Sequence, residues 1–308
     1  MKGRLMTRRR LLIQSVAAAG TFGAGRAATA AAGSDDERRE VRVTGAISDD
    51  EVCRLPRSVT SSLGVVAGQQ VRLRHEDGPA VFTVVPTDEA VGAVGTGGRD
   101  RLGATGDAFD VEVSTRVVHP TRDEATAADT GGFVERLVDA DDERLVVLAP
   151  HGGYIEYGTD EQATHVGERL DVPVWYCAGW WPGGGAFDRW HVGSTDIHPA
   201  SFPRLAEVSN RSFDAVVGFH GWGEDHVAVG GAAPLDRRRT VRDTIAAAVG
   251  DAFDVRLASD ESRDGDHPDN VVNWLSASGR DGVQIEQPWD ARREYGRTIA
   301  DAVADVFE

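Results

Sequence analysis

Apolar and polar positions divide the chain into two regions with different periods. Between residues 41 and 116, short runs of alternating apolar and polar residues are separated by turns rich in glycine and aspartate. This pattern predicts a small β domain. Between residues 131 and 308, short apolar runs alternate with longer segments of helical period. That alternation predicts an α/β domain with a mainly parallel sheet and helices on both of its faces.

Individual elements follow from the same patterns. In the first region we expect strands at 41–47, 70–74, 80–85 and 109–114, a short helix at 58–64, and a glycine-rich turn region at 94–106. In the second region we expect strands at 145–149, 172–177, 213–220, 255–258 and 283–286, and helices at 133–139, 160–170, 203–208, 240–249 and 290–307. The polar segments 33–40 and 117–130 are expected to be linkers.

One phrase in the first region carries a local resemblance. Leu-Pro-Arg-x-Val, followed by Leu-Gly-Val-x-Ala-Gly-x-x-Val-Arg-Leu, spans residues 55–73 and resembles small β-barrels of the double-psi or swapped-hairpin kind. The resemblance implies a β-barrel-like domain over 41–116. Because this region holds no cluster of titratable groups, we expect it to cover the second domain or to bind a polymer or the cell surface.

The first 32 residues have the features of an export signal. Residues 7–12 form the twin-arginine pattern TRRRLL, and a stretch rich in Ala and Gly leads to small residues at 27–32, where cleavage is expected. The alternatives are a basic tail or a membrane anchor. Arg26 interrupts the apolar stretch, which argues against a spanning helix. We therefore expect an exported protein, extracellular or in the cell envelope, with no integral membrane segment.

The charge balance argues against some classes of binding partner. The formal net charge is −17, and Lys2 is the only lysine among 33 basic residues. An excess of acidic residues with almost no lysine favours adaptation to high salt over a merely acidic protein. Such acidity argues against nucleic-acid binding. The two cysteines, Cys53 and Cys177, are too few for a cysteine-rich zinc site, and pairing or separate burial both remain open.

A candidate metal site follows the strand at 145–149. The strand is expected to end at Pro150, and His151, two glycines and Glu156 come directly after it. A second apolar strand ends in His220. Since the carboxyl ends of parallel strands meet at one edge of a sheet, these three side chains are expected to meet there. Two imidazoles and one carboxylate leave a fourth zinc position open, as in catalytic sites.

Other candidate residues surround this set. Glu286 ends the strand at 283–286, where a carboxylate could accept a proton from water and pass it to a leaving nitrogen. His191 and His198 could replace His220 as ligands but fit better as substrate contacts or transition-state donors. The arginines that could hold a substrate carboxylate are Arg211, Arg280 and Arg292.

The motifs that carry these residues resemble one family. Ala-Pro-His-Gly-Gly-x-Ile-Glu-x-Gly-Thr-x-Glu, His-Val-x-Ser-Thr, Phe-His-Gly, Val-Gly-Gly and Gly-Val-Gln-Ile-Glu occur in the order seen in phage-type poly-γ-glutamate hydrolases. The likeness covers residues 146–308. It implies a fold like that of zinc carboxypeptidases, zinc ligands at His151, Glu156 and His220, and a general base at Glu286. His198 departs from the family pattern, as does the domain at 41–116.

Taken together, these observations predict an exported amidohydrolase with one Zn²⁺ ion that cleaves γ-glutamyl amide bonds. Its expected substrate is poly-γ-glutamate or a γ-glutamyl peptide. A zinc carboxypeptidase or an N-acyl-amino-acid deacylase would use the same site with a different pocket. A non-catalytic protein that binds an envelope polymer is the alternative from another class, and the intact ligand set with Glu286 argues against it.

Overall fold

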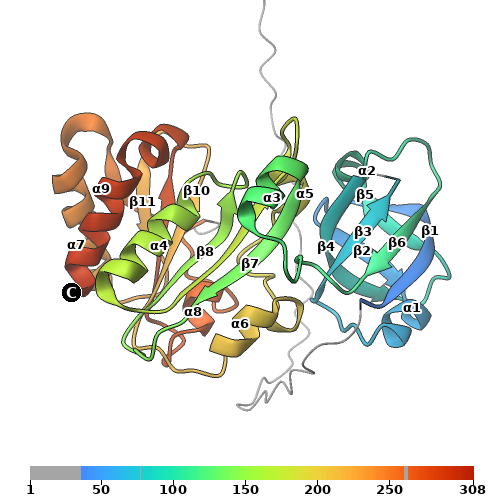
Figure 1. Ribbon diagram of the computed structural model, residues 1–308, viewed down its shortest axis with the longest axis horizontal. Coiled ribbons are helices and arrows are strands. Elements are labelled where there is room, and N and C mark those ends of the chain that lie inside the picture. Colours follow the sequence, from blue (N-terminus) through green and yellow to red (C-terminus); the bar gives the residue numbers. More distant parts are fainter. Residues whose placement is uncertain (1–35, 77, 260–262) are drawn as a thin grey trace, which may run out of the picture.

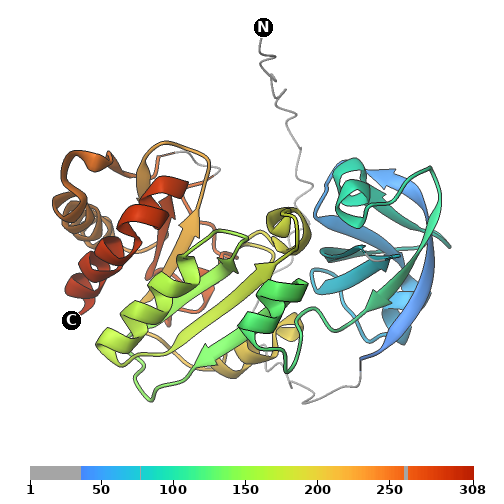
Figure 2. The same ribbon diagram turned by 45° about the horizontal axis from the view of Figure 1, so that its top comes forward.

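A computed structural model describes residues 36–76, 78–259 and 263–308. The predicted export signal at 1–32 lies outside these residues. The described chain forms a closed β-barrel beside a seven-stranded sheet (Figures 1 and 2), which confirms the predicted order of a small barrel followed by an α/β domain. None of the helices in the described part of the chain has the length and apolar character that crossing a membrane requires.

The barrel closes in the strand order β1-β5-β2-β4-β3-β6. Its elements are β1 (Arg38–Ile47), β2 (Val52–Pro56), α1 (Arg57–Ser62), β3 (Gln70–His75), β4 (Gly78–Thr87), β5 (Gly92–Gly95), α2 (Thr96–Leu102) and β6 (Phe109–Ser114). Alternate residues point inward and form a core around Phe82, Leu55 and Leu73, all of which are fully buried. The alternation in the sequence therefore corresponds to the inside and the outside of a barrel.

The prediction of a turn region at 94–106 was wrong, because this segment contains part of β5 and all of α2. Strand β5 pairs parallel with β1 and antiparallel with β2, so its ladder depends on strands distant in sequence. Helix α2 forms despite its glycines because it packs closely on the barrel core. A Cβ atom at Gly98 would lie 3.1 Å from the Phe82 ring. Local glycine content predicts a turn, and tertiary packing overrides it.

The second domain is built on a sheet with the strand order β12-β11-β13-β10-β8-β9-β7. The strands are β7 (Gly132–Val138), β8 (Val146–Gly153), β9 (Val174–Trp180), β10 (Val216–Gly221), β11 (Val227–Gly230), β12 (Val255–Leu257) and β13 (Gly282–Gln287). The pairs β7–β9 and β11–β13 are antiparallel, and the other pairs are parallel. The predicted mixed, mainly parallel sheet is confirmed.

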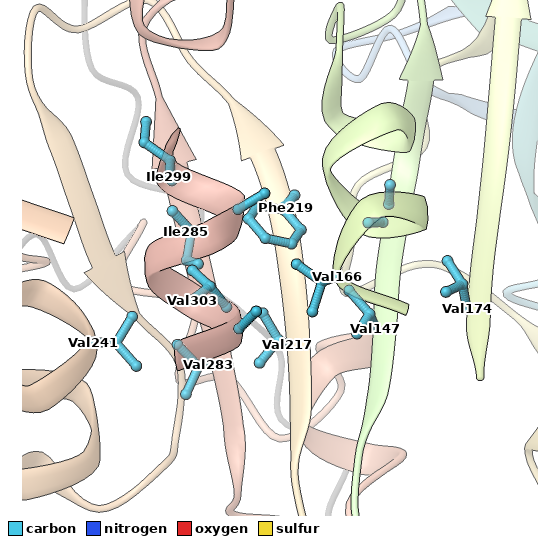
Figure 3. Close-up of a cluster of buried hydrophobic side chains, with 14 of the residues drawn as sticks. Val147, Val166, Val174, Val217, Phe219, Val241, Val283, Ile285, Ile299 and Val303 are labelled. Atoms are coloured by element: carbon cyan, nitrogen blue, oxygen red, sulfur yellow. The ribbon is translucent and has the colours of Figure 1, made fainter. Parts of the chain in front are cut away.

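Helices cover both faces of this sheet. One face carries α3 (Glu124–Thr130), α4 (Thr159–Leu170), α7 (Leu235–Val249) and α9 (Trp289–Phe307), and the other carries α5 (Ala186–Trp190), α6 (Pro203–Val208) and α8 (Val271–Trp274). Figure 3 shows the first face, where Phe219 and Ile285 of the sheet meet Ile299 and Val303 of α9. Each side chain buried there stabilises the fold by about 1.5–3 kcal/mol.

The helix predicted at 133–139 was wrong, because this segment forms the edge strand β7. Its pairing with β9 decides the conformation, since the short sequence FVERLVD fits a helix as well as a strand. Glu135 is buried there, and its carboxylate accepts hydrogen bonds from Trp175 Nε1 at 2.8 Å and from the first turn of α6, at Arg204 N and Leu205 N. The segment 117–130 likewise contains α3, whose first turn is capped by Asp123.

Polar contacts join the barrel to the loop at 191–201. Gln70 donates from Nε2 to the Asp196 carbonyl at 2.6 Å and accepts at Oε1 from His198 N at 3.0 Å. Arg101 is buried, and its guanidinium donates to main-chain carbonyls on both sides of the boundary, including Val81 in the barrel and His191 in the loop. The barrel therefore holds this loop by several hydrogen bonds that are partly buried.

Both cysteines are free and buried. Cys53 packs in the barrel core, and Cys177 packs under the second face of the sheet. Burial raises the pKa of both thiols. Of the two alternatives left open by the sequence, separate burial is the one that the structure supports.

A buried pair of amides links α4, β13 and α9. Gln162 Nε2 donates to Gln287 Oε1 at 2.8 Å, and Gln287 Nε2 donates to Gln162 Oε1 at 2.9 Å. We expect Gln287→Leu or Gln162→Leu to lower the free energy of unfolding by about 1–3 kcal/mol, because each leaves a buried amide without its partner. The double variant should lose less than the sum of the two. Urea denaturation at constant salt measures all three, and strictly additive losses would contradict the pairing.

Candidate metal centre

His151 reaches the edge of the sheet through an irregularity in β8. The sequence predicted that this strand ends at Pro150, but it continues to Gly153. Pairing with β9 shifts between Ala149 and Gly152, so that Pro150 and His151 form a bulge. Proline lacks the N–H group that a regular ladder needs, and bulges of this kind redirect side chains next to functional sites. Gly153 then adopts a φ of +67° with Gly179 backbone atoms close by, a position that a side chain could not share.

Glu156 lies between two imidazoles. Its Oε1 is 3.1 Å from His151 Nδ1, and its Oε2 is 3.4 Å from His220 Nδ1. Oε2 also accepts a hydrogen bond from Gly221 N at 2.9 Å. All three side chains are buried, and one ligand atom from each lies within 4.8 Å of the others. The structure therefore brings together the three residues that the sequence proposed as metal ligands.

The hydrogen bonds of His151 favour a cation between these groups. Its Nε2 lies 2.8 Å from the Val192 carbonyl, which can only accept, so in the neutral ring Nε2 carries the proton and the Nδ1 lone pair faces Glu156. Within the described chain, His151 Nδ1 and His220 Nε2 are buried without a hydrogen-bond partner. A buried lone pair that faces a carboxylate needs positive charge between them. Two imidazoles and a carboxylate suit zinc.

The pKa shifts of His151 and Glu156 indicate the same need for positive charge. Burial lowers the pKa of His151, but Glu156 opposes this effect and the net shift is upward. Burial raises the pKa of Glu156, and the two histidines outweigh it, so the net shift is strongly downward. Both pKa shifts favour positive charge beside Glu156, which a metal ion held by these three side chains would supply.

Glu286 stands on the strand next to His220. The parallel register of β10 and β13 pairs these two residues. Glu286 Oε1 accepts from Gln284 Nε2 at 2.7 Å, and Gln284 Oε1 accepts from Asn270 Nδ2 at 2.7 Å. Residues two apart on a strand share a face, which is why Gln284 can hold Glu286. Burial raises the pKa of Glu286, as suits a carboxylate that accepts and returns a proton.

Arg292 approaches the same edge from the first turn of α9. Its guanidinium packs so closely on Gly221 that a Cβ atom there would lie 2.3 Å from Cζ. Nη1 donates to the Tyr157 carbonyl at 3.1 Å, and Nε is buried without a partner among the described residues. Burial lowers the Arg292 pKa, while Glu156 and Glu286 act in the opposite direction. Of the three arginines proposed from the sequence, this one lies at the site.

His191 also lies at the site, held by the barrel. Its ring centroid is 4.4 Å from that of His151, and Phe187 stacks on it at 4.3 Å. Its Nδ1 lies 2.6 Å from Oε1 of Glu51, a residue between β1 and β2 of the barrel. The loop at 191–201 therefore faces the metal centre through His191 and through the Val192 carbonyl, and the barrel fixes one end of it.

The remaining proposed residues lie elsewhere. Arg211 precedes β10, at the opposite end of the strand from His220, and donates to Asp139 Oδ1 at 2.8 Å. Arg280 is exposed and precedes β13, again at the amino end. His198 lies against the barrel, and its Nδ1 accepts from Ala200 N at 3.2 Å. The expected substrate contacts of Arg211 and Arg280 are therefore not supported by their positions, since the site is at the carboxyl ends.

Comparison with known proteins bears on this geometry. The family model of poly-gamma-glutamate hydrolases matches residues 127–300, which is more than half of the chain. The chain belongs to this family. The match contains all four residues at the centre of the site, His151, Glu156, His220 and Glu286, and it leaves the barrel outside.

Individual proteins that resemble this chain share less than a third of the aligned residues with it. The SPbeta prophage-derived UPF0714 protein YoqZ of Bacillus subtilis (strain 168) is 30% identical over 167 residues, 51% of this chain and 54% of that protein. The chain thus spans about half the length of this curated relative. A solved bacteriophage poly-gamma-glutamate hydrolase is 23% identical, with a TM-score of 0.47, over 59% of this chain and 90% of that one. A structure titled YNDL-apo (Zinc-free) is 20% identical, with a TM-score of 0.45, over 56% and 88%.

Sequence reasoning missed three residues that support the site. Glu51 belongs to the barrel, and no motif or spacing in the sequence connects it with His191. Asn270 lies in a loop and caps α8, which is an ordinary role for asparagine. Gln284 could have been found, because it stands two positions before Glu286 on a predicted strand and so shares its face.

We expect the protein to bind Zn²⁺ through the three buried side chains. Glu156→Gln and His220→Ala should each weaken binding by at least about 100-fold, because the loss of a ligand exceeds the ~10- to 100-fold effect of an outer partner. Calorimetric titration of the metal-stripped protein measures the change. Glu286→Gln is the matched control and should bind as the wild type does. Equal affinity in Glu156→Gln and wild type would refute this ligand set.

Proposed function

We propose that this protein is an exported, zinc-dependent amidohydrolase that cleaves γ-glutamyl amide bonds, with poly-γ-glutamate as its substrate. The observation that carries the proposal is the buried set of His151, Glu156 and His220 with Glu286 on the adjacent strand. This is the constellation expected of a hydrolase, in a chain that belongs to the poly-gamma-glutamate hydrolase family. When bound, zinc would supply Lewis acidity to the amide carbonyl and to water.

The roles of the chain's own residues follow from their positions. Glu286 is proposed to take a proton from water and to deliver it to the leaving nitrogen, and Gln284 keeps its carboxylate in one orientation. Because the Glu286 pKa is raised by burial, the protonated form is accessible during the cycle. Arg292 brings a fixed positive charge beside these carboxylates, where it can hydrogen-bond a substrate carboxylate or the oxygen that gains negative charge.

His191 is proposed to contact the substrate as a hydrogen-bond acceptor. Its Nδ1 bonds to Glu51, so in the neutral ring this nitrogen is the protonated one while the carboxylate is ionised. Burial and the neighbouring His151 lower the pKa of His191 despite the opposing effect of Glu51, so the neutral ring is favoured and its Nε2 is a hydrogen-bond acceptor. The barrel is thereby part of the proposed catalytic centre.

Export and salt adaptation remain proposals that rest on sequence. The twin-arginine pattern at 7–12 supports passage across the membrane in the folded state, which fits a polymer substrate outside the cell. The net charge of −17 with a single lysine supports a high-salt environment. At about 1 M salt the Debye length is roughly 3 Å, so repulsion between an acidic enzyme and an acidic polymer would be screened.

The test is hydrolysis of purified poly-γ-glutamate at high salt by wild type, Glu286→Gln and chelator-treated protein, followed by gel filtration of the products. We expect wild type to shorten the polymer. Glu286→Gln should keep its metal and lose at least about 100-fold in kcat, since it lacks the proton acceptor. Chelation should abolish activity, and added Zn²⁺ should restore it.

Parallel assays separate the other candidate activities. Cleavage of α-linked peptides or N-acyl-amino acids, with the polymer left intact, would replace the substrate assignment by a carboxypeptidase or a deacylase. Polymer binding without cleavage of any of these compounds would indicate a non-catalytic binding protein. Glu286→Gln activity equal to wild type would refute the proposed base.

Glu51 offers a test of the barrel's contribution to the centre. We expect Glu51→Ala to lower kcat by about tenfold, as the loss of an outer partner does, with KM little changed, because His191 loses the group that orients it. Glu51→Gln keeps an acceptor at the same place and should recover part of this loss. Asp88→Asn, an exposed barrel carboxylate, is the matched control. Equal kcat in Glu51→Ala and wild type would contradict the role.

A further inference from the structure

A cavity lies where the barrel meets the sheet. Its volume is about 360 Å³, and it is lined by outward-facing residues of β3 together with residues at the start of β7 and around α5. Figures 1 and 2 show the barrel beside this end of the sheet. The metal-site residues do not line it, so it is distinct from the candidate active site.

The charge of this cavity is opposite to that of the molecule. Four arginines line it, Arg38, Arg72, Arg74 and Arg122, against a single carboxylate, Glu112. The whole chain has a net charge of −17. A positive cavity on an acidic protein is a local feature that favours anions.

Two of the four arginines already have partners. Arg38 forms ion pairs with Asp36 at 2.6 Å and with Glu112 at 3.1 Å, so the only carboxylate of the cavity is already occupied. Arg122 donates from Nη1 to the Gly131 carbonyl at 2.6 Å, which keeps its positive charge uncompensated. Arg122 therefore still contributes positive charge, while direct hydrogen bonds to an anion fall to Arg72 and Arg74.

Arg72 and Arg74 have no side-chain hydrogen bond or ion pair with any described residue. They stand two positions apart on β3 and so share the outer face of the barrel. Arg72 is half-buried, and burial lowers its pKa. A guanidinium that has lost water without gaining a partner is stabilised by an incoming anion, and a carboxylate can bind it through two parallel hydrogen bonds.

Two residues that line the cavity connect it with the candidate metal site, one as a sequence neighbour and one through strand pairing. Trp190 lines the cavity, and the next residue, His191, contacts the His151 ring. Gly132, another lining residue, pairs with Trp180 at the carboxyl end of β9, which is the edge of the sheet that carries the site. A long substrate held at the site can therefore pass this cavity along the same edge.

We propose that this cavity binds free α-carboxylates of the polymer at a distance from the cleaved bond, with Arg72 and Arg74 as the contacts. The proposal rests on the proposed function, because γ-linked polyglutamate carries one such carboxylate per residue. Burial of Arg72 reduces the screening that salt imposes on exposed charges, so the contact persists in high salt. The barrel, which the family match does not include, thus supplies a substrate-binding surface.

The experiment compares wild type with Arg72→Gln, Arg74→Gln and the double variant. Kinetics are measured on long poly-γ-glutamate and on γ-glutamyl dipeptide and tripeptide. We expect the double variant to raise KM for the long polymer about tenfold, as the loss of charged hydrogen bonds does, with kcat unchanged. The short substrates should be cleaved as by wild type. Arg54→Gln, which removes an exposed arginine on β2 outside the cavity, is the control and should change neither value.

Binding of the polymer to an inactive variant tests the cavity independently of whether the protein cleaves the polymer. Labelled poly-γ-glutamate is titrated by fluorescence anisotropy into Glu286→Gln with and without the two arginine substitutions. Weaker binding in the substituted protein supports the cavity even if wild type cleaves no polymer. Equal binding and equal KM overturn it, even if wild type is active. A preference for single-stranded DNA over the polycarboxylate also overturns it.

Discussion

The parallel arrangement of β8, β10 and β13 is the constraint on which the centre depends. Parallel strands end at the same edge, so His151, His220 and Glu286 meet although they are far apart in sequence. The bulge at Pro150 then turns His151 toward Glu156. This geometry encloses a carboxylate and two imidazoles in a dry environment, where they stabilise one another only with a cation present.

The barrel contacts the candidate metal site more directly than its separate position in the sequence indicates. Through Gln70, Arg101 and Glu51 it holds the loop at 191–201, and that loop supplies both the Val192 carbonyl that orients His151 and the ring of His191. An attached domain that only covered the sheet would not need a buried arginine spanning the boundary. The contacts instead fix the loop at several points, which favours one orientation of the groups that face the candidate metal site.

Charge is distributed unevenly over the molecule. The net charge of −17 opposes the approach of the polyanionic substrate proposed for this protein. Arg292 lies at the candidate metal site, and Arg72 and Arg74 of the barrel line the cavity nearby. Half-buried arginine suits this position, because its planar group is weakly hydrated and binds carboxylates in a defined geometry.

Sequence by itself determined the α/β class, the preceding barrel, and the proposed metal set with Glu286. These follow from local patterns. An apolar strand that ends in His or Glu indicates a candidate ligand or base, and a parallel sheet brings the ends of such strands together. Local pattern failed at 94–106 and 133–139, where pairing with distant strands decides the conformation of ambiguous segments. Arg211 and Arg280 precede their strands and Arg292 follows its strand, so chain order and the rule that sites lie at carboxyl ends could have separated Arg292 from the other two. Only the tertiary structure packed Arg292 on Gly221 and brought Glu51 to His191, because contacts between distant segments leave no periodic pattern in the sequence.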